Sequence, residues 1–251
     1  MLHRESADFG PVAFFKAQQQ AFANTLRTRK GDASLIDALL TQAYESFERN
    51  VAIQAEGMPE LDCHKGCATC CTLRVTATAP ELLMISRYIR WIADKLRAAI
   101  GVDLIERILA ADEKTRGLDE RQRVKLRLRC PYIHKGACLI YQVRPLACRG
   151  HASYSAKACA HAASGKTEEI PFSGPHMTVR SLVQNAMQSA LRSAGLCFGL
   201  YELNHGLSIA LQHEGLEQAW LDGKDDAFAA AAVQELSTEE MAQTYDAIRD
   251  L

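Results

Sequence analysis

The nine cysteines of this 251-residue chain are the residues best able to do chemistry, because thiolates bind metals and react as redox groups. Eight of them form two groups: Cys63, Cys67, Cys70 and Cys71, then Cys130, Cys138, Cys148 and Cys159. The odd total, in a chain long enough to build a hydrophobic core, argues against a disulfide scaffold. We therefore expect a cytoplasmic protein whose clustered cysteines are metal ligands.

The adjacent pair Cys70 and Cys71 limits how the cysteines share metals. We expect neighbouring side chains to diverge, so two consecutive cysteines fit poorly around one tetrahedral ion, which needs about four ligands. Two four-thiolate sites, or one multinuclear cluster with additional thiols, explain the pair better. Gly66 would permit the tight turn that brings closely spaced thiols onto one metal.

Iron and zinc both accept thiolates in tetrahedral geometry, so spacing alone leaves the metal open. We favour iron or an iron–sulfur cluster, because adjacent and surplus cysteines suit a multinuclear centre. The alternative is zinc in a structural or protein-interaction module without catalysis. A third class, a thiol oxidoreductase that uses Cys67 and Cys70 as a redox pair, would leave the other cysteines unexplained.

Two stretches resemble the YkgJ-like cysteine-cluster family, also called the CxxCxxCC domain: Cys63–Cys71 followed by Val75, Thr76 and Glu81, and Cys130–Pro131 followed by Cys138–Arg149. The resemblance implies chelation of zinc or iron, often as an iron–sulfur cluster. It also implies kinship with flagellin lysine-methylating enzymes that carry this domain. One departure is that three residues separate Cys63 from Cys67 where the family name implies two, which leaves the local turn open.

Other residues of these stretches could support a bound cofactor. A metal with four thiolates keeps a net negative charge, which is costly to bury unless it is offset. Arg144 and Arg149 flank Cys148 and could donate charge-assisted hydrogen bonds to its sulfur; ordinary surface salt bridges are the alternative. Tyr141 either reaches an acceptor beside the metal or only packs.

Three histidines, His64, His151 and His161, lie within three residues of a cysteine and could replace a thiolate as ligand. An exposed loop histidine is the simpler interpretation of each. Glu81 could also bind iron, but the spacing from Thr78 to Glu81 is that of a helix-capping box, which accounts for Glu81 without a metal.

Outside the cysteine groups, the periodicity predicts helices that hold the centre in place. Apolar residues recur at helical spacing over residues 36–51, 82–96 and 179–194, and a second capping box starts at Ser237. Only residues 73–78 alternate as a short strand would. The sequence therefore predicts a mainly α-helical single domain, residues 1–251. Its irregular cysteine-rich metal-binding core, residues 60–165, is flanked by helical segments 12–58 and 177–250.

Composition excludes several partners. Lys and Arg number 29 against 30 Asp and Glu, so no global field attracts nucleic acid, and no apolar run approaches a membrane span. Basic residues alternate from Arg121 to Arg129 and, if this segment is extended, would form a basic face. We expect that face to be solvated rather than bound to nucleic acid. The partner is then a protein or a small molecule that the sequence does not identify.

These observations give three hypotheses about the centre. Sulfurs from both cysteine groups meet in one compact centre, with the segment between them looping out. The metal contributes much of the stability of residues 60–165, which have few long apolar stripes. Cys197 lies in an apolar stretch and belongs to the core rather than to the ligands.

Overall fold

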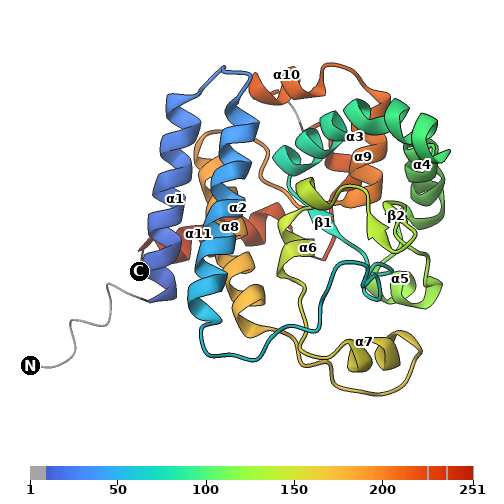
Figure 1. Cartoon of the computed structure of the whole chain (residues 1–251). Coiled ribbons are helices and arrows are strands. Elements are labelled where there is room, and N and C mark those ends of the chain that lie inside the picture. Colours follow the sequence, from blue (N-terminus) through green and yellow to red (C-terminus); the bar gives the residue numbers. More distant parts are fainter. Residues whose placement is uncertain (1–9, 225, 236, 251) are drawn as a thin grey trace, which may run out of the picture.

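Helices account for most of the structure, as the sequence predicted, and the strands form only two small antiparallel pairs. The computed structural model describes residues 10–224, 226–235 and 237–250 (Figure 1), so the other residues of the predicted domain lie outside the described part. The α-helices there are α1 Pro11–Thr28, α2 Leu35–Gln54, α3 Ala79–Ile100, α4 Leu104–Thr115, α5 Glu120–Leu126, α6 Leu146–Gly150, α7 Ala156–Ala163, α8 Gly174–Ser193, α9 Leu203–Gln212, α10 Leu216–Leu221 and α11 Thr238–Asp250. The 3-10 helices are η1 Tyr141–Val143 and η2 Ala229–Ala231, and the strands are β1 Thr76–Ala77, β2 Ile133–His134, β3 Ala137–Cys138 and β4 Tyr201–Glu202.

The predicted apolar stripes lie on α2, α3 and α8. Their buried members are Ile36, Leu40, Ala43, Phe47 and Val51 on α2, Leu82, Ile85, Ile89 and Ile92 on α3, and Val179, Val183, Ala186 and Ala190 on α8. Ala194, the last residue of the third stripe, is exposed because α8 ends at Ser193. None of the helices in the described part of the chain has the length and apolar character that crossing a membrane requires.

The helices pack in two groups that share one hydrophobic core (Figure 1). In the first group α8 packs against α1, α2 and α6, and in the second α9 packs against α3 and α4. Contacts between α2 and α3 join the groups. The buried apolar side chains of both groups form a continuous cluster, and Cys130 and Cys138 pack against its edge. The cysteine-rich segment is therefore attached to the helical core rather than separate from it.

Both predicted capping boxes are present. The Glu81 carboxylate accepts hydrogen bonds from the backbone N–H and the hydroxyl of Thr78 at the start of α3. Before α11, the backbone N–H of Ser237 donates to Glu240 over 2.9 Å, and the N–H of Glu240 donates to the Ser237 hydroxyl over 3.1 Å. Each box satisfies backbone N–H groups that the first turn of a helix leaves without partners.

The strand expected over residues 73–78 is shorter than its alternation indicated. Only Thr76–Ala77 form β1, which pairs with β4 so that Thr76 lies opposite Glu202 and Ala77 opposite Tyr201. Thr78 has the backbone of an N-cap and begins α3, so the strand cannot continue. The pairing with β4 attaches the end of the first cysteine group to the start of α9.

The interpretation of residues 121–129 as an extended basic face is wrong for most of the segment. Residues Glu120–Leu126 form α5, whose start is a third capping box between Asp119 and Gln122. Because the period is helical, Arg123 turns inward and is 3% exposed, whereas Arg121 and Lys125 remain exposed. The basic residues therefore do not share one face.

Candidate metal centre

The first cysteine group lies on an irregular loop made of successive tight turns. The backbone N–H of Cys67 donates to His64 O over 3.0 Å, and the N–H of Cys71 donates to Ala68 O over 3.1 Å. Gly66 has a φ of +96°, which a residue with a side chain rarely adopts. Three residues separate Cys63 from Cys67, and the sequence left open whether the chain still turns between them. The turn at Gly66 shows that it does.

The second cysteine group is spread over regular elements. Cys130 precedes β2, Cys138 lies on β3, Cys148 on α6 and Cys159 on α7. β2 and β3 form a hairpin in which Ile133 lies opposite Cys138. Each thiol of this group thus lies on a different short element or directly before one.

Backbone contacts join the two groups. The N–H of Cys130 donates to Cys71 O over 2.7 Å, so the second group begins where the first one ends. At the other end of the loop, the N–H of Ser153 donates to the Cys63 sulfur over 3.3 Å, and the N–H of Asp62 donates to Ser153 O over 3.2 Å. The two parts of the sequence signature therefore lie against each other, although the whole of α3, α4 and α5 separates them in the chain.

Burial dominates the electrostatics of the second group. It raises the pKa of Cys130 to about 12 and that of Cys148 to about 12, and neighbouring thiols add to both shifts. Burial also raises the pKa of Cys138. These thiols are protonated at neutral pH, so a metal must displace their protons in order to bind.

The thiol of Cys71 affects the pKa of its neighbour Cys70. A side-chain hydrogen bond with Cys71 is the largest cause that raises the pKa of Cys70, and burial is the second. The two thiols lie within reach of each other because the backbone turns here rather than extending. The adjacent pair can therefore contribute to one centre.

The thiols fall into two overlapping neighbourhoods. Burial raises the pKa of Cys63, and charges on three further thiols, those of Cys67, Cys70 and Cys159, raise it as well. On the other side, burial and then the charges of Cys138 and Cys70 raise the pKa of Cys148. Cys70 belongs to both neighbourhoods and therefore links them.

The donor set suits a soft or borderline metal, because it consists of thiols from both groups around a shared residue. Within the described residues, no three His, Cys, Asp or Glu side chains are already arranged to hold one ion. No disulfide joins any of the nine cysteines, all of which lie in the described part. Metal binding requires these thiols to lose their protons.

Of the residues predicted to support a cofactor, Arg144 lies among the thiols. Its positive charge lowers the pKa of Cys70, Cys138 and Cys148, against the larger effect of burial on each. The guanidinium lies 4.0 Å from the centre of the half-exposed Tyr141 ring, which fixes its orientation. The buried Nε of Arg144 has no hydrogen-bond partner among the described residues.

Arg149 makes the salt bridge that the sequence offered as the alternative. Its guanidinium donates to the carbonyl oxygens of Gln142 over 2.8 Å and of Arg144 over 3.0 Å, and to the Glu48 carboxylate over 2.8 Å. The same group lies 3.9 Å from the centre of the Tyr44 ring. These contacts fasten α6 and the preceding turn to α2.

Both carboxylate oxygens of Glu81 accept hydrogen bonds from other residues of the protein. One carboxylate oxygen caps α3, and the other accepts a hydrogen bond of 2.7 Å from the backbone N–H of Leu146. The side chain is buried, and burial raises its pKa. Glu81 thus connects the start of α3 to the start of α6, the helix that carries Cys148.

The three candidate histidines have separate surroundings. His64 is exposed, and its Nδ1 lies 2.9 Å from Asp62 O. The ring of His151 packs against Phe172 with ring centres 4.9 Å apart, and burial lowers its pKa. His161 contacts the carboxylate of Glu168. These contacts explain the positions of the three imidazole rings without a metal.

Arg123 is a residue beside the centre that sequence reasoning missed. Its charge lowers the pKa of Cys130, against the larger effect of burial, and its buried Nε and Nη1 have no hydrogen-bond partner in the described part. Burial raises the pKa of Glu202 to about 7, and the charge of Arg123 opposes this rise. The pattern Asp119-x-x-Gln122 is the sequence signal that could have revealed α5 and its inward-facing arginine.

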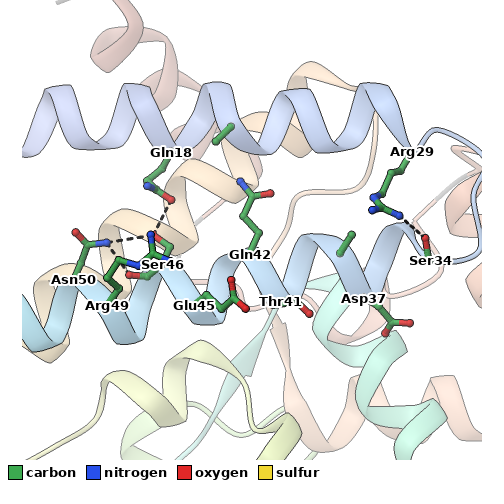
Figure 2. Close-up of a pocket in the computed structure, with 12 residues that line it drawn as sticks. Gln18, Arg29, Ser34, Asp37, Thr41, Gln42, Glu45, Ser46, Arg49 and Asn50 are labelled. Carbon is green, nitrogen blue, oxygen red and sulfur yellow. Dashed lines mark hydrogen bonds between the residues drawn. The ribbon is translucent and has the colours of Figure 1, made fainter.

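A wider groove lies elsewhere, between α1 and α2 (Figure 2). It has a volume of about 600 Å³ and is lined by polar and charged side chains of both signs, including Gln18, Arg29, Asp37, Glu45 and Arg49. No cysteine lines it, and hydrogen bonds such as Ser46 to Gln18, at 2.8 Å, cross it from helix to helix. We therefore assign the chemistry to the cysteine region.

Comparison with known proteins agrees with this assignment. The family model CxxCxxCC, described as "Putative zinc- or iron-chelating domain", matches residues 62–169. No curated protein and no solved structure matches the chain. The matched range contains all eight clustered cysteines and leaves out Cys197, which packs against the helical core. Residues 62–169 of this mainly α-helical protein are therefore similar to the CxxCxxCC family of cysteine-rich chelating domains, and the match supports a metal-binding protein.

Proposed function

We propose that the protein binds iron, as iron ions or an iron–sulfur cluster, at one centre built by cysteines from both groups. The observation that carries the proposal is the backbone contact between the two groups, in which the N–H of Cys130 donates to Cys71 O over 2.7 Å. Charge on Cys70 raises the pKa of Cys148, although α3, α4 and α5 lie between them in sequence. A centre shared by both groups explains why the chain keeps them together.

The number and burial of the thiols favour iron. Cys70 links Cys63, Cys67 and Cys159 on one side to Cys138 and Cys148 on the other, which exceeds what one tetrahedral ion needs. One iron–sulfur cluster would use four of these thiols and leave additional thiols beside it, and a partly buried site would shield the cluster from water. When bound, iron of this kind supplies one-electron redox chemistry or a Lewis acid.

The surrounding residues would support the thiolates. Arg144 and Arg123 place positive charge beside the sulfurs and offset the negative charge of a metal–thiolate centre. Glu81 and Arg149 hold α6 in position, so Cys148 meets the other sulfurs at a fixed place. Tyr141 orients Arg144 from the solvent side.

The proposal extends to a redox or protein-modifying role in the cytoplasm. Its support is the sequence resemblance to domains that flagellin lysine-methylating enzymes carry, and the need of such a centre for reduced cysteines. The eight proposed ligands remain those that the sequence indicated: Cys63, Cys67, Cys70, Cys71, Cys130, Cys138, Cys148 and Cys159.

A zinc-stabilised structural module is the second candidate, and one neighbourhood favours it. The charges of Cys67, Cys70 and Cys159 each raise the pKa of Cys63, and four thiolates complete a structural zinc site. In that case Cys130, Cys138 and Cys148 would remain partly buried free thiols.

Anaerobic purification followed by metal analysis, a sulfide assay and a visible spectrum separates the two candidates. Iron with acid-labile sulfide and a brown colour is the result expected for the first. Colourless protein with stoichiometric zinc would overturn it.

Variants then test whether the centre is shared. Cys70→Ser and Cys148→Ser should each lower the iron content and bleach the spectrum, because each removes a ligand from a different group. Cys197→Ser is the matched control and should change neither. Full metal content in Cys148→Ser would show that the second group is not part of the centre.

A further inference from the structure

A small basic groove lies beside the cysteine region, between α4 and the segment that leads into Cys130. Its volume is about 180 Å³. The lining residues are Arg107, Ala110, Ala111 and Lys114 on α4, and Leu128, Arg129 and Pro131 on the opposite wall. Among these described residues there are three cations and no carboxylate.

The sequence of α4 explains why the groove exists. Residues 107, 110, 111 and 114 follow helical spacing and form one stripe along α4. Two alanines in the middle of this stripe leave space, and a cation stands at each end. On the facing wall, Arg129 adds a third charge directly before Cys130.

The groove is held open by the fold rather than formed by chance between mobile side chains. Arg107 is half-buried, and its Nη2 donates a hydrogen bond of 2.8 Å to the carbonyl oxygen of Ile133 on β2. Pro131 is buried and fixes the backbone of the facing wall. Both walls are therefore tied to the hairpin that carries Cys138.

The charges of the groove are not neutralised within it. Elsewhere on these helices cations have carboxylate partners, such as Arg97 with Asp103 at 2.6 Å and Arg116 with Asp112. Glu106 and Glu113 are exposed on α4, but neither of them lines the groove. Three like charges around a small hollow attract an anion, and they repel one another when none is bound.

We propose that this basic groove binds the phosphate group of a small molecule. Phosphate carries enough charge to balance several cations, and its oxygens accept charge-assisted hydrogen bonds from arginine and lysine. The volume admits a phosphate group with only a few more atoms. The net charge of −1 for the whole chain gives no long-range attraction for an extended polyanion.

The test is calorimetric titration of the full-length, metal-loaded protein with inorganic phosphate and with glycerol phosphate at low ionic strength. Saturable binding of either probe supports the proposal that the basic groove binds phosphate. Tighter binding of glycerol phosphate identifies a phosphate ester as the ligand, and equal or weaker binding identifies free phosphate.

Lys114→Gln and Arg129→Gln should each weaken phosphate binding roughly tenfold, because each removes one charge-assisted contact. Arg121→Gln is the matched control: it removes the same charge from the exposed side of α5, outside the groove. Its affinity should stay within about twofold of the native value. Metal content and circular dichroism establish that each variant is folded.

No saturable binding in the millimolar range would overturn the proposal, and so would equal losses in the Lys114 and Arg121 variants, which indicate general surface charge. Tighter binding of an oligoglutamate peptide, sensitive to the same variants, would assign the groove to an acidic protein segment instead. The outcome is independent of the metal proposal, since phosphate binding is measured apart from metal identity.

Discussion

At the scale of residues, the state of the thiols depends on two opposing effects. Burial raises the pKa of Cys138 and Cys148, while the charge of Arg144 lowers both. A buried thiol without a cation would give up its proton to a metal only at higher pH. We therefore expect the charge of Arg144 to ease metal binding by these thiols, and this effect needs no hydrogen bond from its guanidinium to sulfur.

Arg144→Gln should therefore weaken metal binding by about 10–100-fold. Loss of the positive charge raises the thiol pKa values further, so the pH of half-maximal metal loading should move upward. Metal competition titrations measure both changes. They should run from about pH 6 to about pH 9, a range that includes the ordinary pKa of a thiol.

Arg144→Lys is the control for charge, because it keeps the positive charge while losing the planar group that stacks on Tyr141. It should recover most of the affinity. If Arg144→Gln binds metal with native affinity and native pH dependence, the charge of Arg144 has no part in the centre.

At the scale of elements, α6 decides where Cys148 lies. Glu81 holds the start of this short helix through the N–H of Leu146, and Arg149 ties it to α2. At its end, Gly150 lies so close to α8 that a Cβ atom there would be 2.5 Å from the Cβ of Arg180. The absence of a side chain at position 150 lets α6 approach α8.

Gly150→Ala should destabilise the protein by about 1–3 kcal/mol, because the added methyl group forces α6 and α8 apart. The displacement also moves Cys148, so metal content should fall. Urea unfolding and metal analysis measure the two effects. Gly174→Ala is the matched control, since a Cβ there meets nothing within 4 Å. Equal stability of both variants would show that the contact between α6 and α8 is not tight.

At the scale of the whole molecule, the two cysteine groups are supported unequally. Between residues 52 and 76 no residue is buried, so the loop with Cys63, Cys67, Cys70 and Cys71 has little apolar packing of its own. The second group is interspersed with core residues such as Tyr132, Ile140 and Leu146. Metal binding should therefore matter most for the first loop.

Removal of the metal by a chelator should increase hydrogen exchange in residues 60–75 far more than in α2, α3 or α8. The far-UV circular dichroism should change little, because the helices have their own core. The melting temperature should fall, since binding free energy contributes to folding. Identical melting of the apo and metal-loaded protein would contradict this expectation.

The sequence by itself predicted the main helices and a cysteine-rich segment able to chelate zinc or iron. Apolar periodicity indicated α2, α3 and α8, and the capping pattern located the start of α3, because these signals depend on neighbours within a few residues. Cysteine spacing indicated chelation in the same way. It did not indicate α5 correctly, since the alternation of basic residues concealed the capping box at Asp119.

Only the tertiary structure decided which of these residues meet. The proximity of Cys70 to Cys148, the inward turn of Arg123, and the use of Arg149 to hold α6 all depend on packing between segments far apart in the chain. Local sequence patterns do not record such contacts, because they arise from how the two helix groups pack around one core and bring the cysteine loop against the hairpin.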